Sequence, residues 1–435
     1  MKKLHGLVIS WFYPPGNSSE GLVTYKLLKN SNLTYDVFTR SVQNATIWDR
    51  KTKEDDLVSK NVNIIKSDAT KAKEWINDAV EYFRANSDKY DFIMSRIMGV
   101  EAHEAAILIK QEFPGIKWIA SFGDPLVDSP YIPNPPKRKN PFYMREYIER
   151  EALYGLRRLK VAASPTRRAR RLIWEKDRQE KAREARRLKS INDRTFELAD
   201  KLIFNNDYQY NLAFSRGMSQ YKKKGVVIPH SFDLDLYPKP KEKKRIDKLT
   251  FTYVGHLDKL RNASSLFEAI GKLKSHDEEL DKKAHFNFYG HMSNIDKANI
   301  INNKLSKIVD VYDDVDYKTS LEKILNSDWL ILIDANLNEE LTEYIYFPAK
   351  MADYMGAKKN ILAITQLEGA TADIMRDVKA GQIVTHSADD ISIYLSKIIY
   401  QNYSPAKYIE KEWRKFDARN VAAEFDKIVE KMLDD

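Results

Sequence analysis

The chain has 435 residues, 43% of them hydrophobic, and no cysteine; this length predicts two or three domains, and the missing thiols exclude disulfides and thiolate zinc sites. The net charge of +9 is concentrated between Lys137 and Ser190, where 19 Lys and Arg stand against 7 Asp and Glu, so this segment carries +12 and the rest of the chain −3. No stretch approaches the roughly 18 apolar residues of a membrane span, and the start, MKKLHGLVISWFYPP, lacks a cleavage site, so we expect a soluble cytoplasmic protein without a signal peptide.

The first half of the chain alternates short apolar runs with helical patterns. Amphipathic segments such as residues 72–85 and 101–112 separate the runs. This alternation is typical of a parallel sheet that is covered by helices on both faces. The predicted strands are residues 6–12, 35–39, 62–66, 91–96, 117–122, 201–206 and 225–230.

A basic helical insert, at about residues 137–195, interrupts this first series. Three interpretations are open: a solvated helical hairpin, an amphipathic surface that attracts anionic lipid headgroups, or a surface for nucleic-acid phosphates. No aromatic-interleaved nucleic-acid module accompanies the arginines. We therefore expect residues 137–190 to meet an anionic membrane surface, and we expect no specific nucleic acid.

A second series of strands and helices follows residues 234–248, a linker with two prolines and clustered charge. We predict two Rossmann-like domains, residues 1–235 and 236–404, and a C-terminal helix in residues 405–435 that packs back on the first domain. Such sheets bind ligands at the carboxyl ends of their strands. The predicted strands of the second series are residues 249–255, 285–290, 309–315, 329–334, 360–365 and 381–386.

Two strands of the second series end in glycine. Gly255 ends one strand in YVGHLDKLR, and Arg261 stands beside the following helix start. Its planar guanidinium could hold a diphosphate, although a structural cap explains this loop equally well. Gly290 ends the next strand in FNFYGHMS, a good place for a nucleobase to lie against backbone. His256 and His291 follow these glycines, and nucleotide contact is one interpretation of both.

The stretch YFPAKMADYMGAKKNILAIT, residues 346–365, combines bulky rings and a lysine with a helix start. Tyr346 and Phe347 come before Pro348, and Lys350 follows two residues later. A helix N-terminus attracts anions, so Lys350 predicts an anion site. Asp353 is expected on the first turn, facing the same crevice.

The combination of YVGHLDKLR with FPAKMADYMGAKKNILAIT resembles the retaining glycosyltransferases of the GT-B fold, family 4 in the sugar-nucleotide classification. In that family an E-x7-E motif precedes a phrase like EYMAAGKPILA. Here DYMGAKKNILAIT matches the phrase, and Asp353 takes the second acidic position. The first acidic position falls on Ile345, which departs from the pattern. Of the usual Arg-Lys pair only Arg261 carries over, because Asn262 follows it.

The N-terminal half also carries the resemblance. SWFYPPGNSSEGLVTYKLLKN, residues 10–30, resembles the family's first loop, which implies that Glu20 and Gly21 lie near the reaction centre. WIASFGDPLVDSPY, residues 118–131, resembles a variant seen in members that assemble polysaccharides. Other members have a catalytic histidine after that strand, where Gly123 and Asp124 stand here. Asp124 is our candidate to contact the sugar or the acceptor hydroxyl; a carboxylate that caps a turn is the plainer interpretation.

The resemblance implies an α/β protein of the GT-B class, with two Rossmann-like domains facing across a cleft, the first for the acceptor and the second for the donor. The implied donor is a nucleoside-diphosphate sugar, most simply a UDP-sugar, used with retention and without a metal or other cofactor. Arg261, Lys350 and free helix N–H groups would stabilise the departing diphosphate, and Asp353 would bind the ribose. The implied acceptor is a glycan or a lipid-linked sugar at the inner face of the cell membrane, in cell-surface polysaccharide biosynthesis.

Two other classes of function stay open. Ile345 favours a catalytically silent GT-B scaffold that binds a partner, and the insert would suit a nucleic-acid-binding protein. Two DxD strings, Asp233–Asp235 and Asp314–Asp316, could suggest a metal-dependent transferase. Such triplets arise readily by chance among 63 acidic residues, so we expect no metal site. His103 is interpreted as a packing or capping residue.

Overall fold

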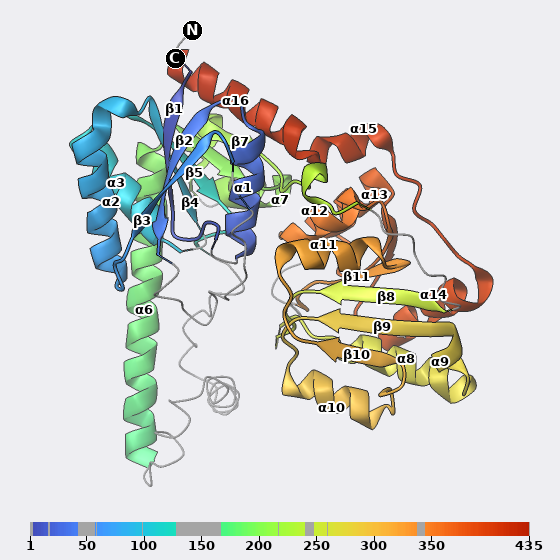
Figure 1. Cartoon of the computed structure of the whole chain (residues 1–435). Helices are drawn as coiled ribbons and strands as arrows, with labels where there is room; N and C mark the ends of the chain where they lie inside the picture. Colours follow the sequence, from blue (N-terminus) through green and yellow to red (C-terminus); the bar gives the residue numbers. More distant parts are fainter. Residues whose placement is uncertain are drawn as a thin grey trace. The chain divides into compact units, whose positions relative to one another are not determined.

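The computed structural model describes residues 3–15, 18–41, 57, 59–97, 99–127, 167–215, 217–239, 248–258, 260–336 and 344–434, with side chains from residue 178 onward in the helix that starts at residue 167. By its internal contacts the chain forms two compact units, Met1–Asp124 with Leu198–Asp435, and Pro125–Glu197. The larger unit contains two parallel sheets (Figure 1). The predicted pair of Rossmann-like sheets is therefore confirmed.

The first sheet has seven parallel strands in the order β3-β2-β1-β4-β5-β6-β7. It contains every strand predicted from the first half of the chain, with small shifts at the ends. The order reverses at β1, so the carboxyl ends of β1 and β4 flank the point where such sheets bind ligands. The strands are β1 (His5–Ser10), β2 (Thr34–Arg40), β3 (Val62–Ser67), β4 (Phe92–Ile97), β5 (Lys117–Phe122), β6 (Lys201–Phe204) and β7 (Gly225–Val227).

The second sheet has six parallel strands in the order β10-β9-β8-β11-β12-β13. It again contains each strand predicted for this half, and its order reverses between β8 and β11. The buried apolar run of β11, WLILI, fits a central strand with helices on both faces. The strands are β8 (Leu249–Val254), β9 (Ala284–Tyr289), β10 (Val309–Tyr312), β11 (Trp329–Ile333), β12 (Asn360–Ile364) and β13 (Gly381–Val384).

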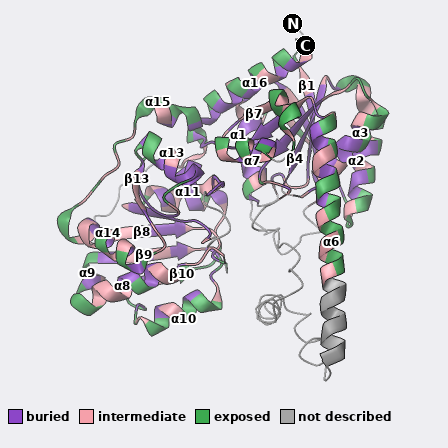
Figure 2. Ribbon diagram, turned by 180° about the vertical axis from the view of Figure 1, so that it is seen from behind, coloured by how far each residue is buried: buried purple, intermediate pink, exposed green. Residues whose placement is uncertain are grey.

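Helices connect the strands. Outer helices such as α2 and α8 bury one side and expose the other, whereas α1 and α12 are buried along most of their length (Figure 2). In the first half, α2 packs against α3, and α1 packs against α16. In the second half, α8 packs against α14 and α10. The helices are α1 (Ser19–Asn30), α2 (Ala72–Asn86), α3 (Glu101–Glu112), α6 (Arg167–Leu198), α7 (Asp207–Ser215), α8 (Ser264–His276), α9 (Leu280–Lys283), α10 (Asn294–Asn302), α11 (Tyr317–Leu325), α12 (Ala349–Gly356), α13 (Ala370–Val378), α14 (Ala388–Gln401), α15 (Glu410–Trp413) and α16 (Ala418–Asp434).

The last helix, α16, completes the core of the first sheet. Phe425 and Val429 are buried in the same apolar cluster as Val8 of β1 and Tyr25 of α1. Buried residues recur every three or four positions along α16, as an amphipathic helix requires. The chain therefore returns from the second sheet to the first before it reaches residue 434.

Helix α6 forms most of the described part of the smaller unit. It runs for 32 residues and carries exposed arginines such as Arg183 and Arg186. Residues 137–166 of the predicted basic insert lie outside the described residues. In the part of the chain that the structure describes, no helix combines the length and the apolar character needed to cross a bilayer.

A buried ion pair joins α1 to α12. Lys26 is only 1% exposed, and its Nζ donates to Asp353 Oδ1 over 2.9 Å. Tyr317 Oη donates to the same oxygen over 2.8 Å. Next along α1, Lys29 donates to Asp233 Oδ2 over 2.5 Å. Burying an ammonium group costs free energy unless it is paired and hydrogen-bonded, so these contacts fix the position of α1 against α12.

Replacing Lys26 with methionine keeps a long apolar stem but leaves the Asp353 carboxylate buried without its counter-charge. We expect the free energy of unfolding to fall by about 3–5 kcal/mol, because an uncompensated buried charge remains. Urea titration measures this as a lower midpoint. The matched control is Lys71→Met, because Lys71 is exposed at the start of α2. Equal midpoints for the two variants would contradict a stabilising role of the ion pair.

Candidate functional site

The carboxyl ends of β8 and β9 meet at two glycines that were predicted to line the site. Gly255 and Gly290 have backbone φ angles of +127° and +126°, which residues other than glycine rarely adopt. A Cβ on Gly255 would collide with Lys350 Nζ, and a Cβ on Gly290 would collide with the Gly255 carbonyl oxygen. The structure therefore brings Gly255, Gly290 and Lys350 together, and glycine is required at both strand ends.

Lys350 lies where the sequence predicted it, at the start of a helix. Helix α12 begins at Ala349, directly after Pro348. Lys350 Nζ donates to Tyr253 Oη over 2.8 Å and lies 4.1 Å from the centroid of that ring. Desolvation, followed by the nearby Arg261, lowers the pKa of the Lys350 ammonium well below its ordinary value. Lys350 and Arg261 are thus two basic groups near each other with little solvent around Lys350, and their repulsion costs free energy. A bound anion would lower this free-energy cost.

Asp334 joins this cluster and was not predicted from the sequence. It directly follows β11, is fully buried, and its Oδ2 accepts from Thr365 Oγ1 over 2.8 Å. Burial raises the pKa of the Asp334 carboxyl, and Arg261 acts in the opposite direction. The signal was present in WLILID, where an aspartate ends a buried strand at the ligand-binding edge.

The two predicted histidines lie beside the glycines. The His256 and His291 rings are 6.3 Å apart, and His256 Nε2 lies 3.0 Å from Asp314 Oδ1. Asp314 is the first acid of the DxD string Asp314–Asp316, so this acid pairs with His256. The second acid, Asp316, caps α11 by accepting from Thr319 N over 2.8 Å. Among the described residues there is no group of three or more His, Cys, Asp or Glu that could hold a metal ion.

The second acid of the family-like motif, Asp353, is held by contacts within the protein. Asp353 is in the second turn of α12, not the first as predicted, because the helix begins at Ala349. Its Oδ1 is used by Lys26 and Tyr317, and Tyr237 Oη donates to its backbone carbonyl over 2.5 Å. That Asp353 also binds a ribose stays a prediction.

Tyr346 and Phe347, two further predicted donor-site residues, have side chains that serve packing. They are 4% and 2% exposed. The Tyr346 ring lies 5.5 Å from that of Tyr344, and Phe347 stacks on His230 at 5.3 Å. With both rings buried, we expect the backbone of this loop rather than its aromatic side chains to meet a ligand.

On the first sheet, the predicted residues Glu20 and Gly21 start helix α1. Arg96 Nη2 lies 2.7 Å from a carboxylate oxygen of Glu20, and Arg96 Nη1 donates to Ser121 Oγ over 2.8 Å. A Cβ on Gly21 would lie 3.2 Å from Tyr13 Cα, so α1 approaches the preceding loop closely. These contacts hold Glu20 in an ion pair at the carboxyl ends of β4 and β5.

Asp124 lies within electrostatic reach of both halves of the site. The side chain is open to solvent, yet surrounding protein desolvates it and, with Glu20, raises the pKa of its carboxyl to about 7. Arg261 and Arg96 act in the opposite direction. The structure therefore brings Asp124 and Glu20 of the first sheet near Arg261 of the second.

Asn205, Asn206 and His230 form a buried polar network that was not predicted. Asn205 Nδ2 donates to the Gly123 carbonyl over 2.6 Å, and Asn206 Nδ2 donates to the Ile345 carbonyl over 3.0 Å. Burial, Arg96 and Lys26 lower the pKa of His230 well below its ordinary value. Polar residues directly after β6, in KLIFNN, were the available signal.

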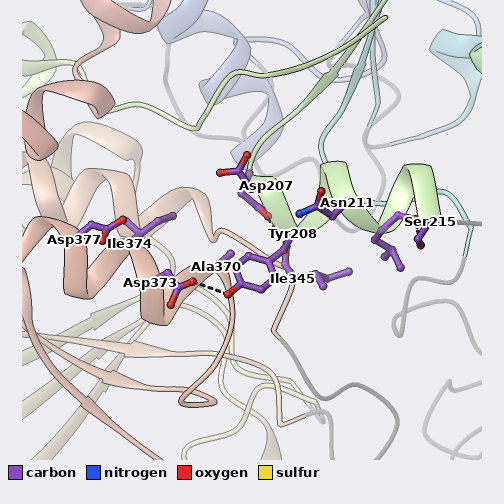
Figure 3. A pocket seen from close by; sticks show the side chains of 11 residues that line it. Asp207, Tyr208, Asn211, Ser215, Ile345, Ala370, Asp373, Ile374 and Asp377 are labelled. Carbon is purple, nitrogen blue, oxygen red and sulfur yellow. Dashed lines mark hydrogen bonds between the residues drawn. The ribbon is translucent and has the colours of Figure 1, made fainter. Parts of the chain in front are cut away.

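Ile345, which takes the first acidic position of the motif, lines a pocket of about 710 Å³ between α7 and α13 (Figure 3). Tyr208 Oη donates to Asp373 Oδ2 over 2.5 Å from one helix to the other.

His103 packs inside the first half of the protein: it is fully buried, with Nδ1 2.8 Å from Ser95 Oγ. The interpretation of His103 as a packing residue is confirmed.

No protein-family model matches the sequence, and no curated protein matches it. Solved structures share its fold. Sucrose-phosphate synthase from Thermosynechococcus elongatus has a TM-score of 0.65 at 14% identity, covering 99% of this chain and 100% of that chain. WaaG, a glycosyltransferase involved in lipopolysaccharide biosynthesis, has a TM-score of 0.57 at 14% identity, covering 98% of each chain. A UDP-N-acetylglucosamine 2-epimerase has a TM-score of 0.52 at 11% identity, covering 100% of this chain and 96% of that chain.

These similarities extend over the whole length of both sheets and show that the chain has the GT-B fold. The predicted GT-B fold class is confirmed, while the basic helical insert stays a prediction. Because this fold is shared by a transferase and an epimerase, the chemistry has to be argued from the site residues.

Replacing Lys350 or Arg261 with alanine removes one cation from the cluster at the carboxyl ends of β8 and β9. We expect each variant to bind UDP about 1.5–3 kcal/mol more weakly, the range for hydrogen bonds to charged groups. Isothermal titration calorimetry measures the change. The control is Lys272→Ala, which removes an exposed lysine of α8 that pairs with Glu268 and Asp389. Unchanged UDP affinity in both site variants would rule out the phosphate assignment.

Proposed function

We propose that the protein transfers a sugar from a nucleoside-diphosphate donor, most simply a UDP-sugar, to a glycan or lipid-linked acceptor with retention at the anomeric carbon. The observation that carries the proposal is the position of Lys350 Nζ against Gly255, where the carboxyl ends of β8 and β9 meet the start of α12, with Arg261 within electrostatic range. The carboxyl ends of β8 and β9 form the adjoining backbone surface, where glycine is required. Neighbours of the same fold include a glycosyltransferase of lipopolysaccharide biosynthesis.

The bond that breaks joins the anomeric carbon to the oxygen of the diphosphate. Negative charge grows on the leaving diphosphate as this bond lengthens. The first N–H groups of α12 have no partners within a helix, and with Lys350 and Arg261 they would meet that charge. Because these groups are in place before the reaction, the site gains stabilisation without a metal ion. A bound diphosphate would oppose the desolvation that lowers the pKa of Lys350 and so would favour its ammonium form.

Asp124 is the group suited to the acceptor side of the reaction. Its pKa of about 7 means that it exchanges a proton near neutral pH. As a carboxylate it would accept a hydrogen bond from the acceptor hydroxyl and orient it. The new C–O bond would form on the face of the anomeric carbon that the diphosphate leaves, and the hydroxyl proton would pass to the departing diphosphate oxygen. Glu20, held by Arg96, stays in position beside it and, through its negative charge, keeps the pKa of Asp124 high. Gly21 lets α1 begin close to this centre.

The rate of sugar transfer should depend on the ionisation of Asp124. Its pKa is raised above the ordinary value, so the proton is held below pH 7 and lost above it. We expect kcat/KM to rise with pH and to level off above about pH 7, with a slope near tenfold per pH unit on the acid side. Asp124→Asn should remove this inflection and most of the activity. The control is Asp88→Asn, an exposed acid after α2. A pH profile unchanged in Asp124→Asn would exclude this role.

A second candidate is a catalytically silent GT-B protein that binds a partner. Two observations favour it: Ile345 has no carboxylate, and the Asp353 carboxylate is held by Lys26. Incubation with a panel of UDP-, GDP- and dTDP-sugars separates the candidates. Transfer or slow hydrolysis supports the transferase. Absence of turnover together with absence of thermal stabilisation by every nucleotide supports the silent protein, and C2 epimerisation of the donor would support neither.

We further propose that the basic insert attracts an anionic membrane surface, where a lipid-linked acceptor would lie, so that the enzyme works in the cytoplasm at the inner face of the membrane. The support is the charge of +12 over residues 137–190 and the exposed arginines of α6. A basic surface gains attraction from anionic headgroups through each Lys or Arg that comes near them. Nucleic acid remains the alternative partner for the same charges.

Removing two exposed arginines in Arg183→Ala/Arg186→Ala should weaken binding to vesicles that contain phosphatidylserine. We expect a loss of roughly 1 kcal/mol per residue, or about thirtyfold in total. Vesicle co-sedimentation measures it, and Lys71→Ala/Lys297→Ala is the control with the same loss of exposed charge outside α6. If the native protein binds single-stranded RNA but no vesicles, the nucleic-acid alternative replaces the membrane.

A further inference from the structure

The pocket between α7 and α13 lies at the ligand-binding edge of both sheets. Helix α7 starts at Asp207, three residues after β6, and α13 starts at Ala370, shortly after β12. Both helix starts line the pocket. Its volume of about 710 Å³ falls within the roughly 300–1,000 Å³ of small-molecule sites. The pocket therefore has the location and size of a substrate subsite.

The pocket is amphipathic, with an apolar part and a polar part. Its apolar side chains are Leu212, Ile345, Ala370 and Ile374. Its carboxylates are Asp207, Asp373 and Asp377, with amide groups from Asn206 and Asn211. Among the described residues that line it there is no lysine or arginine, although Arg376 pairs with Asp373 from beside it.

Such a lining matches the two faces of a sugar ring. Carboxylates and amides accept and donate hydrogen bonds to hydroxyl groups, and an apolar surface packs against the C–H face of the ring. The hydrogen bond from Tyr208 to Asp373 fixes one wall in place (Figure 3). Three carboxylates with one adjoining arginine leave the pocket negatively charged, so a phosphate or a carboxylate on the ligand would be repelled.

We propose that this pocket binds a neutral or amino sugar of the acceptor and rejects sugar phosphates and other anionic sugars. None of the cations assigned to the diphosphate lines the pocket. Its residue Asn206 follows Asn205, which donates to the Gly123 carbonyl next to Asp124, so we assign the ligand to the acceptor side. Ile345 is then a specificity residue: its side chain supplies apolar contact where a glutamate would add a fourth negative charge. The inference rests on the proposed function, because it assigns the acceptor class of that reaction.

Ligand-observed saturation-transfer NMR on the full-length protein without nucleotide tests the pocket. The probes are methyl β-D-glucosaminide, methyl β-D-glucoside and glucose 6-phosphate at equal concentration. We expect the amino sugar to bind best, the neutral sugar next, and the sugar phosphate not at all. In Asp207→Asn/Asp377→Asn the preference for the amino sugar over the neutral one should fall about fivefold, as for exposed ion pairs.

The control variant is Asp389→Asn, which removes an exposed acid of α14 that pairs with Lys272. Binding of glucose 6-phosphate as tight as that of the amino sugar overturns the inference. So does the absence of binding by all three probes, or an equal preference in the pocket variant and the control. UDP affinity, measured on the same samples, reports the proposed function separately: intact UDP binding with no sugar binding refutes the pocket alone.

Ile345→Glu gives an independent check of the same inference. It adds a carboxylate to the lining and removes apolar contact. We expect it to weaken binding of the methyl glucoside and to widen the preference for the glucosaminide. Equal effects on the two sugars would show that Ile345 does not set the specificity of the pocket.

Discussion

The arrangement of the candidate site depends on one buried ion pair, Lys26 with Asp353. Each partner lies in the middle of a helix whose first turn carries site residues. Glu20 and Gly21 lie in the first turn of α1, which begins at Ser19, and α12 begins just before Lys350. A buried ammonium tolerates little movement away from its counter-charge, because separation would leave two uncompensated charges in the protein interior. The pair therefore sets the register of α1 against α12, and with it the position of Glu20 relative to Lys350.

Whereas this ion pair stabilises the protein, like charges within the site repel one another and destabilise it. Lys350 and Arg261 are close enough for Arg261 to lower the lysine pKa, and Asp124 and Glu20 are close enough to raise that of Asp124. Each like-charged pair costs free energy in the empty protein. The ion pair of α1 and α12 supplies the rigidity that keeps these groups together. A diphosphate brought to the cations would remove the first cost, and a hydroxyl that donates to Asp124 would stabilise its carboxylate. Part of the free energy of ligand binding would then come from relief of these unfavourable charge interactions.

Much of the fold was predictable because alternation of buried strands and helices is a local pattern. The strands of the described residues follow from short apolar runs, and Pro348 marks the start of α12, where it is the residue directly before the helix. The residues that were missed act over long range. Lys26 resembles any solvated helix lysine, and only the packing of α12, more than three hundred residues later, makes it buried. Asn206 likewise gains its role from Ile345, which lies 139 positions away.

The family-like acidic motif shows where sequence resemblance and structure give different information. By resemblance, both acidic positions should face the donor. In the structure the first position is an isoleucine in the pocket between α7 and α13, and the second is held by Lys26. A carboxylate that neutralises a buried lysine cannot leave it without a large cost. Under the proposed function, recognition of the donor would therefore rest on the cations and the strand-end backbone, and Asp124 and the pocket beside Ile345 would position the acceptor.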